Sequence, residues 1–73
     1  MTYQKESPRN SLASKLKEYR KLNGLSQQEV ASMLGRHQSF VSRTENGLRK
    51  ITIDDLTAFS KVFRITIEEI LSK

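Results

Sequence analysis

Large apolar residues recur every three or four positions along most of the chain, which is the spacing of one face of an α-helix. Leu12, Leu16 and Tyr19 form the first such stripe, and Phe59 and Phe63 belong to another. Five stretches of this kind can be distinguished, and none favours a strand over a helix. The pattern therefore predicts an all-α chain with five helices.

A second pattern marks where three of these helices begin. A serine or threonine is followed three residues later by an acidic residue, the spacing of a capping box, in which each side chain bonds to the other's backbone N–H. The three pairs are Ser26 with Glu29, Thr52 with Asp55, and Thr66 with Glu69. Each pair predicts the start of the helix that follows it.

Glycine marks the expected helix ends, because a residue without Cβ enters the left-handed conformation at little cost. The first helix is expected to end at Gly24, the second at Gly35, and a third, from about residue 38 to 45, at Gly47. The start of the first helix is open. Ser7 before Pro8 suits an early start, but we favour a later cap within residues 10–11.

Length and composition limit the chain to one small domain. Its 73 residues are 36% hydrophobic and 29% charged, with no cysteine to form a disulfide, so most large apolar residues are needed for the core. Residues 1–10 have no apolar repeat and are expected to form a flexible arm before a domain of residues 11–73. No apolar run approaches a signal peptide or a membrane span, which favours a cytoplasmic protein without a membrane partner.

The positive charge is concentrated in the first two thirds of the chain. Thirteen Lys and Arg residues against eight Asp and Glu residues give a net charge of +5, and residues 1–50 hold ten of the basic residues but only four of the acidic ones. Nucleic acid is one anionic partner that such a surface suits. An ordinary solvated basic surface is the alternative, so charge alone does not decide.

Residues 27–47 have the pattern of a helix-turn-helix. Two short predicted helices are joined through Gly35, with the small Ala31 where they cross and Val41 where the second helix packs back. A fixed angle between the two helices lets the second one protrude into a major groove about 12 Å wide.

Most of the chain, from residue 11 to about 71, resembles the lambdoid phage repressor and Cro family, also called the XRE family. The residues that carry the resemblance are Leu16, Arg20, Gly24, Leu25, Gln27, Glu29, Ala31, Leu34, Gly35, Val41, Ser42, Glu45, Asn46 and Gly47. The resemblance implies a compact five-helix bundle that binds double-stranded operator DNA, usually as a homodimer, with the third helix in the major groove.

Carried over position by position, the resemblance implies a base-reading set of Gln38, Ser39 and Arg43. Glutamine suits adenine, serine suits either base type, and arginine suits guanine. The phosphate-contacting set is Gln27, Arg36, His37, Asn46, Arg49 and Lys50, with Gln27 also able to brace Gln38. Without the resemblance, the residues of both sets are equally explained as ordinary polar surface.

Arg20 and Glu45 are implied to be structural. In the resembling proteins this pair is a largely buried ion pair between the first helix and the end of the third. The position of Phe40 stays open between contact with DNA and cover for the edge of the bundle.

Several residues depart from the family pattern. Thr44 stands where a large apolar residue is usual, Arg64 where glycine is usual after the fourth helix, and Ile51 and Thr52 where the preceding loop usually has a proline. These changes put loop geometry in question more than the fold.

One feature of the sequence, besides the resemblance, supports dimerisation. Four isoleucines exceed what so small a core needs, and an exposed subset would suit a two-fold interface. They are Ile51, Ile65, Ile67 and Ile70. The alternative is that all four are buried within one chain.

Enzymatic function is not expected. The chain has no cysteine, one histidine and no glycine-rich phosphate loop, and helix capping explains the neighbouring Asp54 and Asp55. No cofactor, metal or small-molecule ligand is predicted. The remaining alternatives to a transcriptional regulator are a protein-interaction adaptor on the same fold and an antitoxin-type regulator acting with a partner protein.

Overall fold

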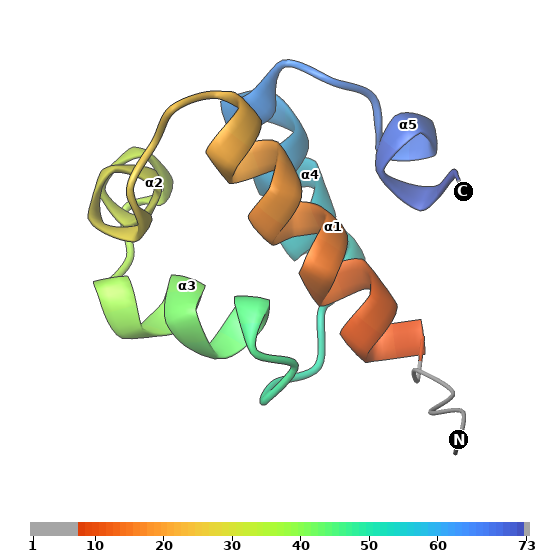
Figure 1. Cartoon of the computed structure of the whole chain (residues 1–73), viewed down its shortest axis with the longest axis horizontal. Coiled ribbons are helices and arrows are strands. Elements are labelled where there is room, and N and C mark those ends of the chain that lie inside the picture. Colours follow the sequence, from red (N-terminus) through yellow and green to blue (C-terminus); the bar gives the residue numbers. More distant parts are fainter. Residues whose placement is uncertain (1–7, 73) are drawn as a thin grey trace, which may run out of the picture.

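The structure is a computed structural model that describes residues 8–72, with side chains from Leu12 onward. Its five helices are α1 (Pro8–Leu22), α2 (Gln27–Leu34), α3 (Gln38–Glu45), α4 (Ile53–Phe63) and α5 (Ile67–Leu71). In Figure 1, α1 crosses α4 at the centre of the molecule, α2 and α3 lie at one end and α5 at the other. Within the described range there is no strand, so the prediction of an all-α bundle is confirmed.

The first helix begins earlier than expected. It starts at Pro8, the earlier of the two alternatives, rather than after a cap at residues 10–11. Proline at the first helical position loses no hydrogen bond, because the N–H groups of the first turn have no partner within the helix. Residues 8–10 therefore belong to α1, and the rest of the expected arm lies outside the described residues.

The three predicted capping boxes all form, and each sets the start of its helix. At α2, the Glu29 N–H donates to Ser26 Oγ over 3.0 Å, and the Ser26 N–H donates to Glu29 Oε1 over 2.8 Å. Local bonds of this kind satisfy N–H groups that the helix itself leaves unpaired. The starts of α2, α4 and α5 therefore need no tertiary contact to be defined.

The core draws on all five helices. Its buried members are Leu16, Val30, Ala31, Val41, Leu56, Phe59, Phe63 and Ile70. Phe59 and Phe63 stack on one another with ring centroids 5.9 Å apart, and Tyr19 stacks on Phe63 at 6.2 Å. Ala31 and Val41 are both fully buried. The two helices of the predicted motif are thus fixed to each other by the core.

Thr44 is anchored by hydrogen bonds where an apolar residue was expected. Its side chain is fully buried, its hydroxyl donates to the Phe40 carbonyl over 2.7 Å, and Arg49 Nη1 donates to it over 3.4 Å. A buried hydroxyl without partners would cost free energy. Here those partners satisfy the hydroxyl, so Thr44 can stay buried on the inner side of α3.

One of the dimer candidates is wrong. Ile70 is fully buried because α5 turns its inner face onto α1 and α4. The other three are partly buried and pack against the core; they are Ile51, Ile65 and Ile67. The large apolar side chains that are exposed are Leu22, Met33, Leu48, Ile53 and Leu71.

α4 ends on a strained residue. Arg64 takes the left-handed conformation, with φ 58° and ψ 44°, where the resembling family has glycine. An L-residue with a Cβ pays about 1–2 kcal/mol for this conformation. The exit from α4 therefore keeps the usual geometry at the expense of local strain.

We expect Arg64→Gly to raise the free energy of unfolding by about 0.5–1 kcal/mol, because relief of strain exceeds the extra entropy that glycine has in the unfolded chain. Urea unfolding followed by circular dichroism measures this. Arg64→Ala is the matched control, since alanine removes the charge but keeps the Cβ. Equal stabilisation by both substitutions would contradict the strain argument.

Candidate nucleic-acid interface

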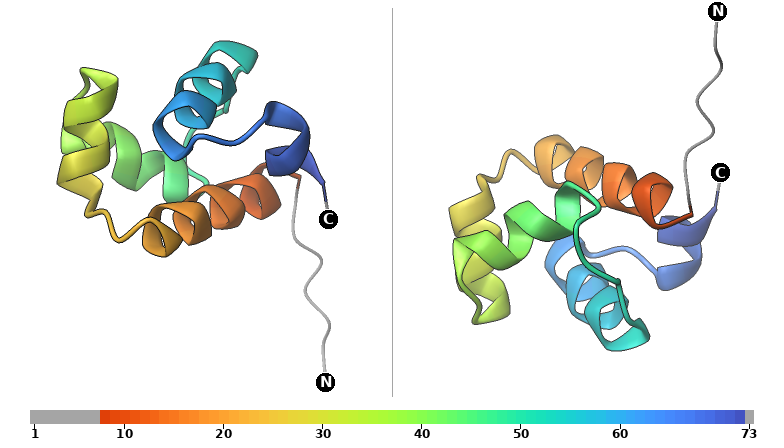
Figure 2. Two further views of the ribbon diagram at one scale, coloured as in Figure 1. Left: turned by 90° about the horizontal axis from the view of Figure 1, so that it is seen from above. Right: turned by 90° about the horizontal axis from the view of Figure 1, so that it is seen from below.

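The turn between α2 and α3 sets the angle at which α3 leaves the body of the protein. Gly35 lies in the left-handed region, with φ 70° and ψ 34°, and the Arg36 N–H donates to the Ala31 carbonyl over 2.9 Å. His37 is the N-cap of α3 without a side-chain capping bond. α3 lies at the lower left of the molecule in Figure 1, and the right-hand view of Figure 2 shows it from below.

A buried ion pair ties α1 to the end of α3. Arg20 Nε lies 2.6 Å from Glu45 Oε2 and Nη2 lies 3.1 Å from Oε1, and the side chains are only 11% and 1% exposed. Arg20 Nη1 also donates to the Leu25 carbonyl over 2.8 Å. The hydrogen bond to Glu45 raises the pKa of Arg20 more than burial lowers it. The guanidinium of Arg20 and the carboxylate of Glu45 thus form a bidentate ion pair, in which two N–H groups donate to two different oxygens.

The same carboxylate begins a chain of hydrogen bonds that reaches the first residue of α3. Gln27 Nε2 donates to Glu45 Oε1 over 3.0 Å, and Gln38 Nε2 donates to Gln27 Oε1 over 2.5 Å. An ionised carboxylate only accepts, so the Gln27 nitrogen must face Glu45 and its oxygen must face Gln38. Glu45 thereby determines the orientation of both amides, and Gln38 uses one of its two N–H groups inside the protein.

The predicted base-reading residues share the outer side of α3. Gln38, Ser39 and Arg43 are all exposed, and Ser39 and Arg43 line one cavity. Of the predicted phosphate contacts, Gln27 is partly buried at the start of α2. Four others are exposed around α3: Arg36, His37, Asn46 and Lys50. The arrangement is a polar surface centred on one helix, and its charged members, Arg36, Arg43 and Lys50, are all basic.

Arg49 differs from the other predicted phosphate contacts. Its Nη1 donates to Asp55 Oδ2 over 2.9 Å, and its side chain is only 26% exposed. Burial raises the pKa of Asp55. Hydrogen bonds from the Thr52 backbone N–H, from Arg49 and from the Thr52 hydroxyl lower this pKa by more than burial raises it, so the net shift is downward. Arg49 therefore joins the loop after α3 to the capping box of α4.

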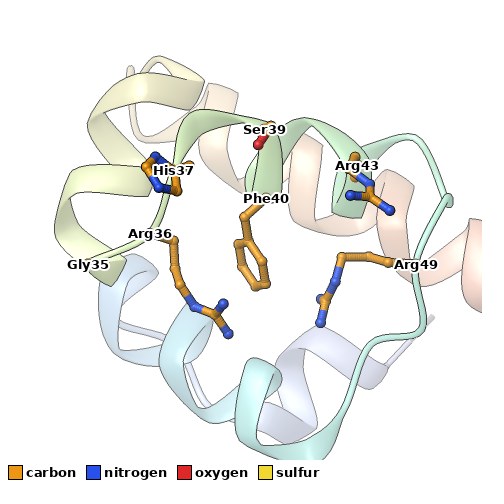
Figure 3. Close-up of a pocket in the computed structure, with 7 residues that line it drawn as sticks. All are labelled: Gly35, Arg36, His37, Ser39, Phe40, Arg43 and Arg49. Atoms are coloured by element: carbon orange, nitrogen blue, oxygen red, sulfur yellow. The ribbon is translucent and has the colours of Figure 1, made fainter.

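Phe40 is a member of this surface that sequence reasoning left open. Its ring is partly buried and stacks on Phe59 with centroids 6.4 Å apart. The guanidinium carbons of Arg36 and Arg49 lie 4.1 Å and 4.4 Å from its ring centroid, and Figure 3 draws them on either side of the ring. Arg36 lies in the turn before α3 and Arg49 in the loop after it, so helical spacing indicated neither contact.

Metal and membrane chemistry have no support in the described part of the chain. No cluster of three or more His, Asp or Glu side chains suits a metal ion there. None of the helices within residues 8–72 has the length and apolar character needed to cross a bilayer. The exposed side chains around α3 can form hydrogen bonds and carry positive charge.

The fold and this surface define a helix-turn-helix protein. A family model described as helix-turn-helix matches residues 16–70, and the chain belongs to this family, in its XRE type. The control protein C.SmaI of Serratia marcescens is 27% identical to it over 62 residues, which cover 85% of this chain and 74% of that protein.

Two solved structures are similar in both fold and sequence. The restriction-modification controller protein C.AhdI of Aeromonas hydrophila has a TM-score of 0.79 and 26% identity, covering 84% of this chain and 92% of that one. SinR, a master regulator for biofilm formation solved in complex with DNA, has a TM-score of 0.76 and 29% identity, covering 84% of this chain and 98% of that one. Family and relatives together place the chain among DNA-binding transcriptional regulators rather than enzymes.

We expect Arg20→Ala to lower the free energy of unfolding by about 3–5 kcal/mol, because it leaves the Glu45 carboxylate buried with its charge uncompensated. Any loss of DNA binding should therefore follow from unfolding. Thermal and urea unfolding measure the change, and Lys21→Ala, at an exposed neighbour on α1, is the matched control. Near-normal stability combined with abolished binding would contradict the structural role of Arg20.

Proposed function

We propose that this protein regulates transcription by reading a specific DNA sequence in the major groove with α3, as a homodimer on a two-fold operator. The observation that carries the proposal is the exposed, polar face of α3 joined by hydrogen bonds to a buried ion pair. A helix held in this way presents its side chains to base edges in one fixed geometry, which direct readout requires.

The orientation of the Gln38 amide favours adenine as the base that Gln38 contacts. One N–H of its amide is used by Gln27, which leaves the carbonyl oxygen and one N–H for a base. Adenine offers a complementary donor at N6 and an acceptor at N7, whereas guanine offers two acceptors. Ser39 suits either base type, and Arg43, one turn further along α3, suits guanine O6 and N7.

The remaining polar residues supply affinity without sequence information. Exposed cations and N–H donors at both ends of α3 suit phosphates of the two strands. We assign this role to Gln27 at the N-terminus of α2, and to Arg36, His37, Asn46 and Lys50. Arg49 contributes less positive charge than Arg36 or Lys50, because Asp55 already compensates it.

For the homodimer, Ile51, Ile65 and Ile67 stay candidates. Leu48 and Ile53 support an interface near the first of them, because they are 66% and 67% exposed and stand within three residues of Ile51. Two recognition helices about 34 Å apart would then require half-sites separated by about one turn of DNA.

Selection of bound sites from random duplex DNA tests the proposal as a whole. The expected result is a symmetric consensus with half-sites one turn apart, bound about 10³–10⁵-fold more weakly at 200 mM than at 50 mM salt if six to ten phosphates are contacted. Failure to enrich any sequence, with no salt-sensitive binding, would overturn it in favour of an adaptor that binds protein.

Gln38→Ala should weaken binding to the selected operator by about 1–3 kcal/mol, because it removes a bidentate base contact, while binding to unrelated duplex stays nearly unchanged. Fluorescence anisotropy with both duplexes measures the two affinities. Gln28→Ala, which removes the same group from an exposed site on α2, is the control. Equal loss on operator and unrelated DNA would assign Gln38 to the scaffold.

Gln27→Met keeps the length of the side chain but removes the acceptor that orients Gln38. A Gln38 amide released in this way can turn both N–H groups toward guanine, so the preference for adenine over guanine at that base pair should fall by up to about tenfold. Affinities for the operator and its adenine-to-guanine variant measure this, with Gln28→Met as control. An unaltered ratio would mean that Gln38 selects its base without Gln27.

A further inference from the structure

A small cavity lies between the end of α2, the start of α3 and the first turns of α4. Its volume is about 120 Å³, and apolar side chains from all three helices line it. They are Leu34, Phe40, Ala58 and Phe59. The other lining residues are charged and come from the turn before α3 and from α4. Apolar walls with a few charged groups are the usual composition of a site for a small molecule.

The charged residues of this cavity are Arg36, Asp54 and Asp55, and only the last of them is already paired. Asp55 Oδ2 accepts a hydrogen bond from Arg49 Nη1 over 2.9 Å. Neither Arg36 nor Asp54 takes part in the ion pairs that join side chains from Leu12 onward, so neither has an opposite charge within 4.0 Å in that part of the chain. The cavity therefore carries one uncompensated cation and one uncompensated anion.

Arg36 lies on the ring of Phe40 instead of pairing with Asp54. Its guanidinium carbon is 4.1 Å from the ring centroid, inside the limit of about 6 Å for a cation–π contact, and Phe59 stacks on the same ring from the core. Figure 3 draws Arg36 extending from the turn before α3 in the direction of α4. A side chain that is already held in place loses little further rotamer freedom when it binds a ligand. Opposite charges thus line one cavity without meeting.

A zwitterion with a small apolar group complements this arrangement. A carboxylate suits the guanidinium of Arg36, which can donate two parallel N–H bonds to it, and an ammonium group suits the carboxylate of Asp54. A purely cationic ligand would be repelled by Arg36 and a purely anionic one by Asp54. A water molecule occupies about 30 Å³ in the liquid, so the cavity has room for about four of them, or for a side chain of about three or four carbons.

We propose that this cavity binds a free α-amino acid with a small apolar side chain, such as leucine or valine. Its carboxylate lies at Arg36, its ammonium group lies at Asp54, and its side chain enters the cavity beside Ala58. The site itself follows from the cavity. Its effect on DNA binding rests on the proposed function, in which Arg36 contacts a phosphate, because a bound carboxylate occupies the N–H donors that the phosphate would use.

Titration of the full chain with L-leucine, followed by the backbone amide signals in NMR spectra, tests the site. We expect saturable shifts centred on Arg36, Asp54 and Ala58. L-Alanine has a much smaller side chain and should bind about tenfold or more weakly, since each CH₂ group removed from water contributes about fourfold. Isopentylamine and isocaproate keep the apolar group of leucine but only one of its charges, and each should bind about fivefold or more weakly.

Substitutions of the two charged residues should reverse the preference between the analogues, which unfolding cannot do. Asp54→Asn should weaken leucine binding and favour isocaproate, whereas Arg36→Gln should weaken it and favour isopentylamine. Ala58→Leu, which fills the cavity, should abolish binding of all three ligands. Glu68→Gln is the matched control, because Glu68 is an exposed carboxylate at the same helix position of α5 as Asp54 of α4. Shifts that do not saturate, that alanine reproduces, or that are equal in Asp54→Asn and Glu68→Gln would overturn the proposal.

Operator affinity with and without L-leucine tests the effect on DNA. Leucine should lower this affinity by no more than Arg36→Gln does, because both remove the same contact, and it should have no further effect in Arg36→Gln. In Asp54→Asn the effect of leucine should be lost. Saturable leucine shifts with an unchanged operator affinity would support the site and reject its effect on DNA. Saturable shifts in a chain that binds no duplex would support the site and reject the proposed function.

Discussion

The carboxylate of Glu45 is the group on which the rest of the structure depends. It is almost completely buried, and it accepts hydrogen bonds from Arg20 on α1 and from Gln27 on α2 while lying at the end of α3. A buried charge is tolerated only when it is paired and hydrogen-bonded. Three helices therefore have to meet at one point. α3, with eight residues, is too short to be a stable helix alone, so its form and direction derive from this meeting.

Features that depend on neighbouring residues were predictable from the sequence. The capping boxes at Ser26 and Thr66 and the left-handed turn at Gly35 depend on bonds between residues a few positions apart. The local sequence is therefore enough to predict them. The roles of Arg20 and Glu45 needed more. They lie 25 positions apart, and only the resemblance to a family of known architecture indicated that they meet.

Features that depend on packing were not predictable in the same way. The burial of Ile70 is decided by how α5 lies on α1 and α4, and the sequence offers four isoleucines without ranking them. Arg49 carries the same charge as Lys50, yet only Arg49 reaches Asp55. The sequence also did not show how the buried hydroxyl of Thr44 is satisfied, because one of its partners, Arg49, is placed by the path of the loop after α3.

The turn at Gly35 has a wider consequence. A Cβ built on this residue would meet no atom within 4 Å, so the restriction on it is one of handedness and not of volume. A Cβ at this corner is sterically permitted, but an L-residue there would be strained by the positive φ, as Arg64 is at the end of α4. Glycine thus lets the chain turn between α2 and α3 without that strain, and the outer side of the turn stays open for whatever approaches α3 from that direction.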